Sequence, residues 1–324
     1  MTESQKIFGM VMKETSGIII GYEEIIEDFL ICLSAGGHIL LEGVPGISKT
    51  TLAKTMSEIV GMKFKRIQFT QDLLPADITG HYFFNQKEQD FLFREGPIFA
   101  NVVLADEINR APSKTQSALL EAMEENQVTV EGTTFKLEEP FMVIATINPV
   151  EHEGVYSLPE AQLDRFMMKS KMEYLTPERE LNLLRLKNRG WKDQTFNVIK
   201  GNIFAMMRKE IKACRADDTI LTYVRDLVLE TRNDSNVVLG ASPRAAEQLV
   251  YASKGSAILS GRTYTIPDDV KKVFRKMIPH RLGMSLDSEL EGKTAENVVE
   301  DILAKVPVVS ARPVARPVQR TVSG

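Results

Sequence analysis

The sequence predicts an α/β domain with a largely parallel, three-layer sheet, followed by an all-α domain. Up to about Lys171, short apolar runs alternate with segments of helical periodicity, and from Pro177 to Val306 helical segments follow one another without a convincing central strand. Strands that alternate with helices are typical of parallel sheets covered on both faces. We therefore expect an α/β core over residues 1–176 and a helical domain over residues 177–305.

In the first domain, the residue patterns locate the elements one by one. EEIIEDFLICLSAGG places its apolar residues on one helical face and ends at Gly36–Gly37. HILLEG is a short apolar run of the buried-strand type, and the segment from Thr50 to Val60 is an amphipathic helix that stops at Gly61. The remaining strand candidates are KFKRIQFT, NVVLADE and FMVIATINP.

The second domain and the tail follow from the same kind of reading. The helix candidates are PERELNLLRLK, NVIKGNIFAMMRKEIKA, DTILTYVRDLVLETR, SPRAAEQLVYASKGSAIL and IPDDVKKVFRKMI. The tail, residues 306–324, repeats Arg-Pro-Val and contains no acidic residue, so we expect it to be disordered. An arm that binds a partner or a phosphate group is the alternative.

Composition limits the possible partners and compartments. The net charge is −4 with 26% charged residues, which argues against nucleic acid as the main partner because duplex-binding proteins usually carry a basic surplus. The two cysteines, Cys32 and Cys214, have no CxxC spacing, which favours a reducing compartment. The first residues do not resemble a signal peptide, and no apolar stretch approaches the roughly 18 residues of a membrane span. We expect a cytoplasmic protein.

The stretch HILLEGVPGISKTTLAK predicts a phosphate-binding loop between a strand and a helix. The Walker A pattern requires Gly, four residues, Gly, Lys and then Ser or Thr, and here Ser48 stands where the second glycine is usual. Lys49 would reach the β- and γ-phosphates, and the Thr50 hydroxyl would bind Mg²⁺. The loop residues that we expect to contact the nucleotide are Gly43, Val44, Pro45, Gly46, Ile47, Ser48, Lys49, Thr50 and Thr51. An ordinary strand–turn–helix is the alternative.

Polar side chains follow two further strand candidates. Asp106 and Glu107 end the apolar run NVVLA, where Asp106 would hold Mg²⁺ and Glu107 would polarise the attacking water. Asn148 ends FMVIATI and could orient that water, although an asparagine before Pro149 can also simply cap a turn. Arg165 and Arg244 are candidates to neutralise charge in the transition state; their alternative is a structural or solvated ion pair.

Together these segments resemble the MoxR family of AAA+ ATPases. The matching stretches are GVPGISKT, LLPADITG, FREGPIF, LADEINRAPSKTQSALLEAMEE, ATINP, LPEAQLDRF and GASPRA, in order over about residues 15–280. The resemblance implies an AAA+ P-loop NTPase core, a helical lid and a ring, usually a hexamer, with ATP between subunits. It makes Asn148 sensor 1, Arg165 the arginine finger that acts on the neighbouring subunit and Arg244 sensor 2 of the lid. It also puts Gly21 and Tyr22 near the adenine, Tyr22 in place of the glutamine that the family often has.

The resemblance also implies a function. MoxR-like ATPases generally act as chaperones that mature or activate partner complexes, often with von Willebrand factor A (VWA) domain proteins, and sometimes aid metal or cofactor insertion. Gln71–Gly80 with the residues up to REGPIF matches the helix-2 insert, and Gln127–Leu137 matches the hairpin before sensor 1. This second hairpin is acidic, which disfavours DNA as its ligand. A nucleic-acid remodelling ATPase and an ATP-gated scaffold with little turnover are the alternatives.

Overall fold

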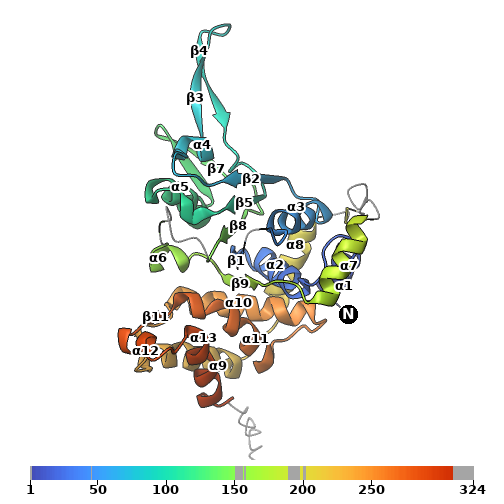
Figure 1. The fold of residues 1–324 in the computed structure, drawn as a ribbon, viewed down its shortest axis with the longest axis vertical. Helices are drawn as coiled ribbons and strands as arrows, with labels where there is room; N and C mark the ends of the chain where they lie inside the picture. Colours follow the sequence, from blue (N-terminus) through green and yellow to red (C-terminus); the bar gives the residue numbers. More distant parts are fainter. Residues whose placement is uncertain are drawn as a thin grey trace, which may run out of the picture.

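The computed structural model describes residues 2–44, 46–149, 156, 158–188, 198–199 and 202–308. At its centre lies a five-stranded parallel sheet with the strand order β2-β5-β8-β1-β9 (Figure 1). The strands are β1 (Ile39–Gly43), β2 (Phe64–Gln68), β5 (Val102–Asp106), β8 (Met142–Ile147) and β9 (Met168–Met172). The predicted strands are all in this sheet. The pattern missed β9, because MKSKM at the sheet edge carries lysines at alternate positions and has no apolar run.

Alternate residues of the three inner strands, β5, β8 and β1, face two separate hydrophobic layers. On β1, Ile39 and Leu41 pack in one buried cluster, whereas Leu40 packs in the other. The first layer holds α2 (Glu23–Ala35) and α3 (Lys49–Ile59), and the second holds α5 (Ser113–Glu125). This arrangement follows from the period of two in a strand and confirms the three-layer α/β class.

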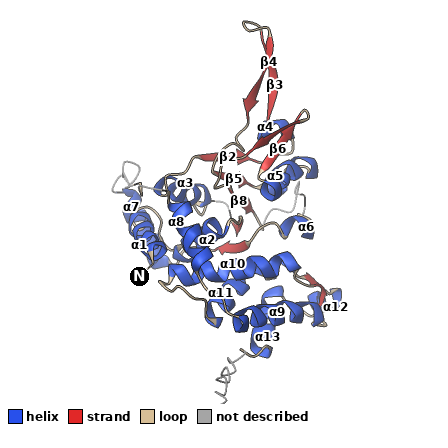
Figure 2. Ribbon diagram, turned by 180° about the vertical axis from the view of Figure 1, so that it is seen from behind, coloured by secondary structure: helices blue, strands red, loops and turns tan. Residues whose placement is uncertain are grey.

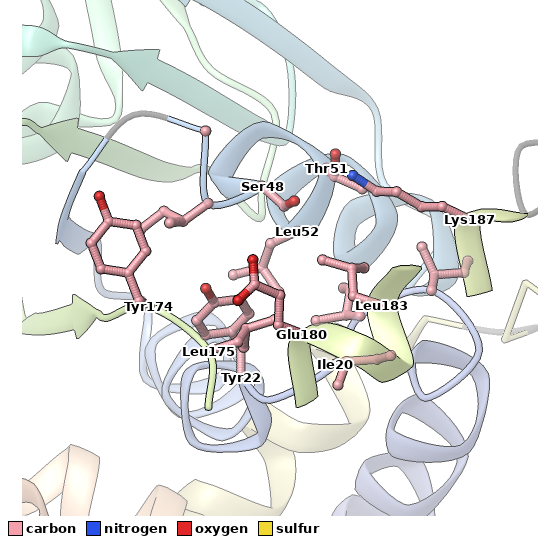
Figure 3. Close-up of a pocket in the computed structure, with 14 residues that line it drawn as sticks. Ile20, Tyr22, Ser48, Thr51, Leu52, Tyr174, Leu175, Glu180, Leu183 and Lys187 are labelled. Atoms are coloured by element: carbon pink, nitrogen blue, oxygen red, sulfur yellow. The ribbon is translucent and has the colours of Figure 1, made fainter. Parts of the chain in front are cut away.

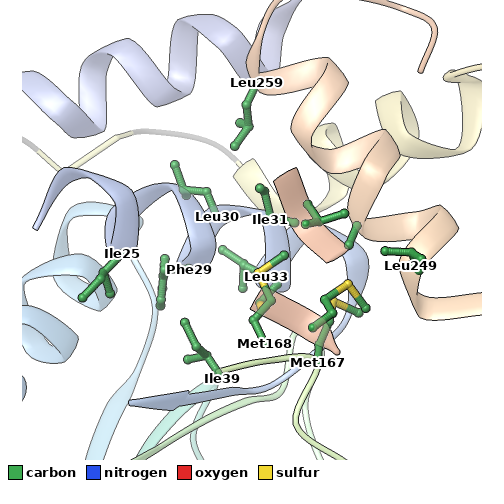
Figure 4. Packing of buried hydrophobic residues seen from close by; sticks show 14 of the residues in the cluster. Ile25, Phe29, Leu30, Ile31, Leu33, Ile39, Met167, Met168, Leu249 and Leu259 are labelled. Carbon is green, nitrogen blue, oxygen red and sulfur yellow. The ribbon is translucent and has the colours of Figure 1, made fainter. Parts of the chain in front are cut away.

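The helical region of the second half packs against the first layer. Its helices are α7 (Pro177–Asn188), α8 (Ile203–Ala213), α9 (Asp218–Asn233), α10 (Pro243–Leu259), α11 (Pro267–Met277), α12 (Leu286–Leu290) and α13 (Ala295–Lys305). Leu249 and Leu259 of α10 belong to the same buried cluster as Leu30 and Leu33 of α2 (Figure 4), so one core joins both regions. A small antiparallel sheet of β10 (Val237–Leu239) and β11 (Gly283–Met284) adds strands that the pattern did not predict.

The first and last parts of the chain complete the arrangement. The N-terminal helix α1 (Glu3–Thr15) contacts α8 and α10, and α8 also contacts α2, so these helices tie the two regions together. The domain boundary at residue 176 remains a prediction. The disorder predicted for residues 306–324 stays a prediction, because residues 309–324 lie outside the described part of the chain. Among the described residues, no helix is long and apolar enough to cross a membrane.

A long hairpin of β3 (Gly80–Asn85) and β4 (Asp90–Glu95) projects from the body (Figures 1 and 2). It follows the short helix α4 (Pro75–Thr79), and its base stacks on a second hairpin of β6 (Gln127–Val130) and β7 (Thr133–Lys136). The Phe93 and Phe135 rings lie parallel with centroids 4.2 Å apart. These hairpins occupy the two regions expected from the sequence resemblance.

Two glycines close the base of the β3–β4 hairpin. A Cβ atom on Gly80 would lie 2.2 Å from the Arg94 carbonyl oxygen, and one on Gly96 would lie 2.2 Å from that of Ile78. Gly80 also has φ +92°, which disfavours other residues. Just beyond the glycines, the Ile98 N–H donates to the Ile78 carbonyl at 3.2 Å. The two ends of the hairpin therefore meet where it leaves the body.

Candidate nucleotide-binding and hydrolysis site

The predicted phosphate-binding loop connects β1 to α3. Gly43 ends β1, where an added Cβ would lie 2.5 Å from Ile47 Cδ1 and 2.8 Å from the Met172 carbonyl oxygen. Gly46 has φ +84°, a conformation that glycine adopts without strain. Pro45 lies outside the described residues. The loop thus uses both predicted glycines for steric reasons.

Ser48 adopts a glycine-like backbone conformation. It immediately precedes α3 with φ 69° and ψ 24°, in the left-handed region that costs a non-glycine residue about 1–2 kcal/mol. This left-handed backbone conformation explains why the Walker A pattern usually has glycine at the position of Ser48. Serine accepts the same backbone turn at an energetic cost.

Lys49 is buried at the start of α3. It is 9% exposed, and its Nζ donates to the Gly43 carbonyl at 2.5 Å. The amine thus reaches back across the loop that leads into its own helix. A positive charge at a helix N-terminus surrounded by backbone N–H groups is suited to holding phosphate.

Asp106 ends β5 within reach of several donors. Its Oδ1 accepts from Thr146 Oγ1 at 2.6 Å, and its Oδ2 lies 3.5 Å from Thr50 Oγ1. Arg66 on the adjacent strand β2 donates to Oδ2 from Nε at 3.1 Å and from a terminal nitrogen at 2.7 Å. A hydroxyl and a carboxylate oxygen side by side are the donors that Mg²⁺ prefers, so Thr50 and Asp106 fit the predicted ion.

Glu107 is held by a separate set of contacts. Its backbone has φ +57°, and its N–H donates to Thr146 Oγ1 at 2.8 Å. Its Oε2 accepts from Gln68 Nε2 at 2.8 Å and from Arg110 at 2.9 Å. The left-handed turn after β5 directs this carboxylate away from the strand, toward the end of β2.

Sequence reasoning did not single out Arg66, Gln68 and Thr146. They enter the site because β2 and β8 flank β5, with Gln68 in register with Asp106 and Thr146 at the end of β8. The signal was available in part: Arg66 and Gln68 are polar residues two positions apart near the end of a predicted strand. Two such residues share a face and meet the neighbouring strand's end.

Asn148 directly follows β8 and is buried, at 4% exposed. It lies at the same carboxyl edge of the sheet as Asp106, because β5 and β8 are parallel neighbours. The polar residues predicted for Walker A, Walker B and sensor 1 therefore gather at one edge of the sheet. Open α/β sheets bind their ligands there.

Arg165 and Arg244 form a different group. Arg165 follows the short helix α6 (Glu160–Leu163), and Arg244 lies in the first turn of α10. Both pair with the carboxylate of Glu124 in the last turn of α5, at 2.8 Å and 3.0 Å. Neither lines the pocket beside the loop. The structure therefore brings these two arginines together with each other, not with Lys49.

An apolar pocket of about 200 Å³ opens beside the loop (Figure 3). The lining residues are Ile18, Ile19, Ile20, Tyr22, Gly46, Ile47, Ser48, Thr51, Leu52, Tyr174, Leu175, Glu180, Leu183 and Lys187. An apolar cavity with a few polar groups, next to a phosphate loop, suits a nucleotide base and its ribose. The α7 side chains in it were not predicted from the sequence.

Gly21 and Tyr22 lie where the chain enters α2. The Tyr22 hydroxyl donates to the Glu173 carbonyl at 3.1 Å, and burial raises the pKa of this phenol. Gly21 has φ +88° and lines the adjoining cleft, not the pocket itself. A Cβ there would lie 2.6 Å from Leu175 Cδ2, so the glycine allows the pocket wall to pack.

Comparisons with known proteins place this site in context. Residues 38–168 match the family model of the ATPase family associated with various cellular activities (AAA), and residues 229–302 match the AAA lid domain. The chain is 41% identical to Chaperone MoxR1 of Mycobacterium tuberculosis, covering 93% of this chain and 82% of that protein.

Other relatives agree with these matches. YeaC of Bacillus subtilis, an uncharacterised protein, is 44% identical over 96% of this chain and 97% of its own length. Protein MoxR of Methylorubrum extorquens is 28% identical over 91% of this chain and 92% of its own length. The crystal structure of a candidate ATPase from Cytophaga hutchinsonii is 40% identical, with a TM-score of 0.88 and coverage of 95% and 96% of the two chains.

Proposed function

The chain belongs to the MoxR family of AAA+ ATPases, and from this premise we propose that it hydrolyses ATP with Mg²⁺ in a ring of identical subunits. We propose a hexamer, with each nucleotide between two subunits. The energy would drive chaperone-like maturation or activation of partner protein complexes.

One observation carries the hydrolysis proposal. The carboxylates of Asp106 and Glu107, the Thr50 hydroxyl and the Lys49 amine lie at one edge of the sheet, around a glycine loop at a helix N-terminus. A purely structural strand end would not need two carboxylates held in separate directions by Thr146, Arg66 and Gln68. Binding without turnover would not need Glu107.

The residues have distinct roles in this proposal. Thr50 and Asp106 would hold Mg²⁺, which when bound would neutralise charge on the β- and γ-phosphates. Glu107 would orient a water molecule in line with the γ-phosphorus and accept its proton. The water oxygen forms the new bond to phosphorus, and ADP leaves with the electrons of the broken P–O bond. Lys49 would stabilise the negative charge, and Asn148 would help to orient the water.

We propose that Arg165 and Arg244 act on the nucleotide of the neighbouring subunit. Their shared ion pair with Glu124, apart from the pocket of their own chain, supports this arrangement. An arginine supplied in trans accelerates phosphoryl transfer by about 10³–10⁵-fold in other NTPases. Hydrolysis would therefore depend on assembly of the ring.

The cellular role is proposed from the family. The partner would be a client protein, of which a VWA-domain protein is one candidate, and the work would include metal or cofactor insertion. We propose the cytoplasm as the compartment, on the basis of the sequence composition alone. The net charge of −4 gives no reason to prefer nucleic acid as the client.

The test is steady-state release of phosphate from ATP by the assembled protein. We expect Glu107→Gln to lose at least about 10²-fold in rate while it still binds ATP, as expected for loss of a general base. A wild-type rate at the background level, no higher than that of Glu107→Gln, would refute the hydrolysis proposal and leave an ATP-gated scaffold; equal rates above background would refute the role of Glu107. Stimulation by DNA with steep salt dependence would instead favour a nucleic-acid remodelling ATPase.

A further inference from the structure

Arg281 is a buried arginine between the α/β core and the helical region. It lies in the 3₁₀ helix at Pro279–Arg281, and its side chain is 1% exposed. We propose that Arg281 is a positioning residue that fixes Arg165 and Arg244 as one unit for use on the neighbouring nucleotide. This inference rests on the proposed function.

On one side, Arg281 binds the segment that carries Arg165. Its Nε donates to Asp164 Oδ1 at 2.8 Å, and its terminal nitrogens donate to the carbonyls of Asp164, Phe166 and Met167 at 3.1, 2.8 and 3.0 Å. These three bonds to backbone carbonyls fix the backbone on both sides of Arg165. The Arg165 guanidinium is not bound by Arg281; it is 28% exposed and pairs with Glu124 at 2.8 Å.

On the other side, the same guanidinium binds the helical region. It donates to Gln248 Oε1 on α10 at 2.7 Å and to the Met277 carbonyl at the end of α11. Arginine suits this position because its planar fork offers several donors in fixed directions, whereas a lysine ammonium is a single point charge. One side chain therefore joins the core segment to two lid helices.

Asp164 extends the connection to Arg244. The Ser242 hydroxyl lies 3.2 Å and 3.3 Å from the two Asp164 oxygens, and it accepts the Ala245 N–H at 3.1 Å as the N-cap of α10. Arg244 is in the first turn after this cap. Asp164 is thus the chain neighbour of Arg165 and, through Ser242, a support of the turn that carries Arg244.

Charge and burial make this connection stiff. Loss of either partner would leave the other charge without compensation, at a site where the Arg281 side chain is 1% exposed and the Asp164 side chain 24% exposed. The Arg281–Asp164 pair therefore holds the core segment and the lid together. We expect a displacement of the lid to carry Arg165 with Arg244, because both guanidiniums also pair with the Glu124 carboxylate.

The test uses Arg281→Lys, which keeps the charge beside Asp164 but loses the fork. We expect kcat for ATP to fall by at least about tenfold with KM nearly unchanged, because the affected arginines serve the neighbouring site in the transition state. Gln248→Ala, which removes only the acceptor on α10, should show a smaller loss of the same kind. It decides the question if Arg281→Lys does not fold.

Mixed rings separate a positioning role from general damage. Lys49→Ala subunits lack a working phosphate loop but keep their arginines, so an equal mixture with Arg281→Lys subunits should regain activity. In a head-to-tail ring, about a quarter of the interfaces would pair an intact loop with intact arginines. Arg165→Ala subunits mixed in the same way are the positive control.

Lys276→Met is the matched negative control. Lys276 also joins the lid to the core through a buried carboxylate, Asp28, with Nζ 2.8 Å from Oδ2, but it has no contact with the arginine pair. It should lower stability and leave kcat per folded ring unchanged. Failure of the Arg165→Ala mixture to regain activity would refute the trans site of the proposed function. Two results would overturn this inference alone. The first is that the Arg165→Ala mixture regains activity while the Arg281→Lys mixture does not, and the second is that Arg281→Lys has the kcat of the wild type.

Discussion

Substitution of His38 should change how the stability of the protein depends on pH. This histidine is buried between the end of α5 and the start of β8: its Nδ1 accepts the Val143 N–H at 3.0 Å, and its Nε2 lies 3.0 Å from the Met123 carbonyl. Since a carbonyl can only accept, Nε2 carries the proton and the ring is neutral. Burial lowers the pKa of His38 from 6.5 to about 4.

The sign and size of the effect follow from this shift. Because the folded pKa lies below the unfolded one, the unfolded chain binds the proton first as the pH falls. The neutral His38 ring therefore makes its full contribution to the free energy of unfolding above pH 6.5, the pKa of the unfolded chain. That contribution is lost as the pH falls toward the folded pKa of about 4. The full shift corresponds to about 3 kcal/mol, of which about 2 kcal/mol is lost by about pH 5.

The assay is urea unfolding of the wild type and His38→Gln at a series of pH values between about 7.5 and 4.5. We expect His38→Gln to be less stable at neutral pH, because glutamine cannot satisfy both partners as the ring does, and to lose about 2 kcal/mol less than the wild type on acidification. The buried His280 is present in both proteins, so its own lowered pKa cancels in the difference.

His81→Gln is the control, because His81 is exposed at the start of the β3–β4 hairpin. Its stability should follow the wild type at every pH. If the difference between the wild type and His38→Gln is independent of pH, or grows as the pH falls, the buried neutral tautomer is refuted.

Three further predictions concern the site and the hairpins. Ser48→Gly should raise the free energy of unfolding by at most about 1 kcal/mol, because relief of the left-handed φ of 69° is partly offset by the chain entropy of glycine; urea unfolding measures it, and a loss of stability would contradict it. Arg66→Ala should lower the Mg²⁺ concentration that supports tight ADP binding several-fold, because the guanidinium on Asp106 Oδ2 no longer competes with the ion. Lys65→Ala, on the same strand, should need the same Mg²⁺ concentration as the wild type. If Arg66→Ala and Lys65→Ala need equal Mg²⁺ concentrations, Arg66 does not compete with the ion for Asp106. Phe135→Ala should remove the stacking with Phe93, worth about 1 kcal/mol, and speed amide hydrogen exchange over residues 80–95; unchanged exchange would show that the stack does not support the hairpin.

The fold was predictable wherever a local pattern matched a local cause. HILLEG and FMVIATI are apolar because their strands are buried on both faces, and SPRAAEQLVYASKGSAIL begins at Ser242, which caps α10. The edge strand β9 escaped prediction because one side of MKSKM is not fully covered, so Lys169 and Lys171 interrupt the apolar run.

The site was predictable only in its sequence-adjacent parts. Gly43 to Thr50 and Asp106–Glu107 are contiguous motifs, so their chemistry can be read from the chain. The contacts of Arg66 with Asp106 and of Gln68 with Glu107 depend on strand register, which no local pattern fixes. Likewise, Arg165 and Arg244 share Glu124 because helices far apart in sequence pack together. Such convergence is a property of the tertiary structure.

Because its base is closed, the β3–β4 hairpin is a structural unit that leaves and re-enters the body at one point; we call it the arm. Gly80 and Gly96 let the two backbone segments of the hairpin approach each other closely at its base. The hydrogen bond from the Ile98 N–H to the Ile78 carbonyl joins the same two segments just outside the hairpin. None of the strands of the central sheet belongs to the arm. We therefore expect changes in its length and tip sequence to leave the register of β2, β5 and β8 unchanged. Substitutions in the arm and substitutions at the candidate site on the sheet edge should then act independently, both in evolution and in protein engineering.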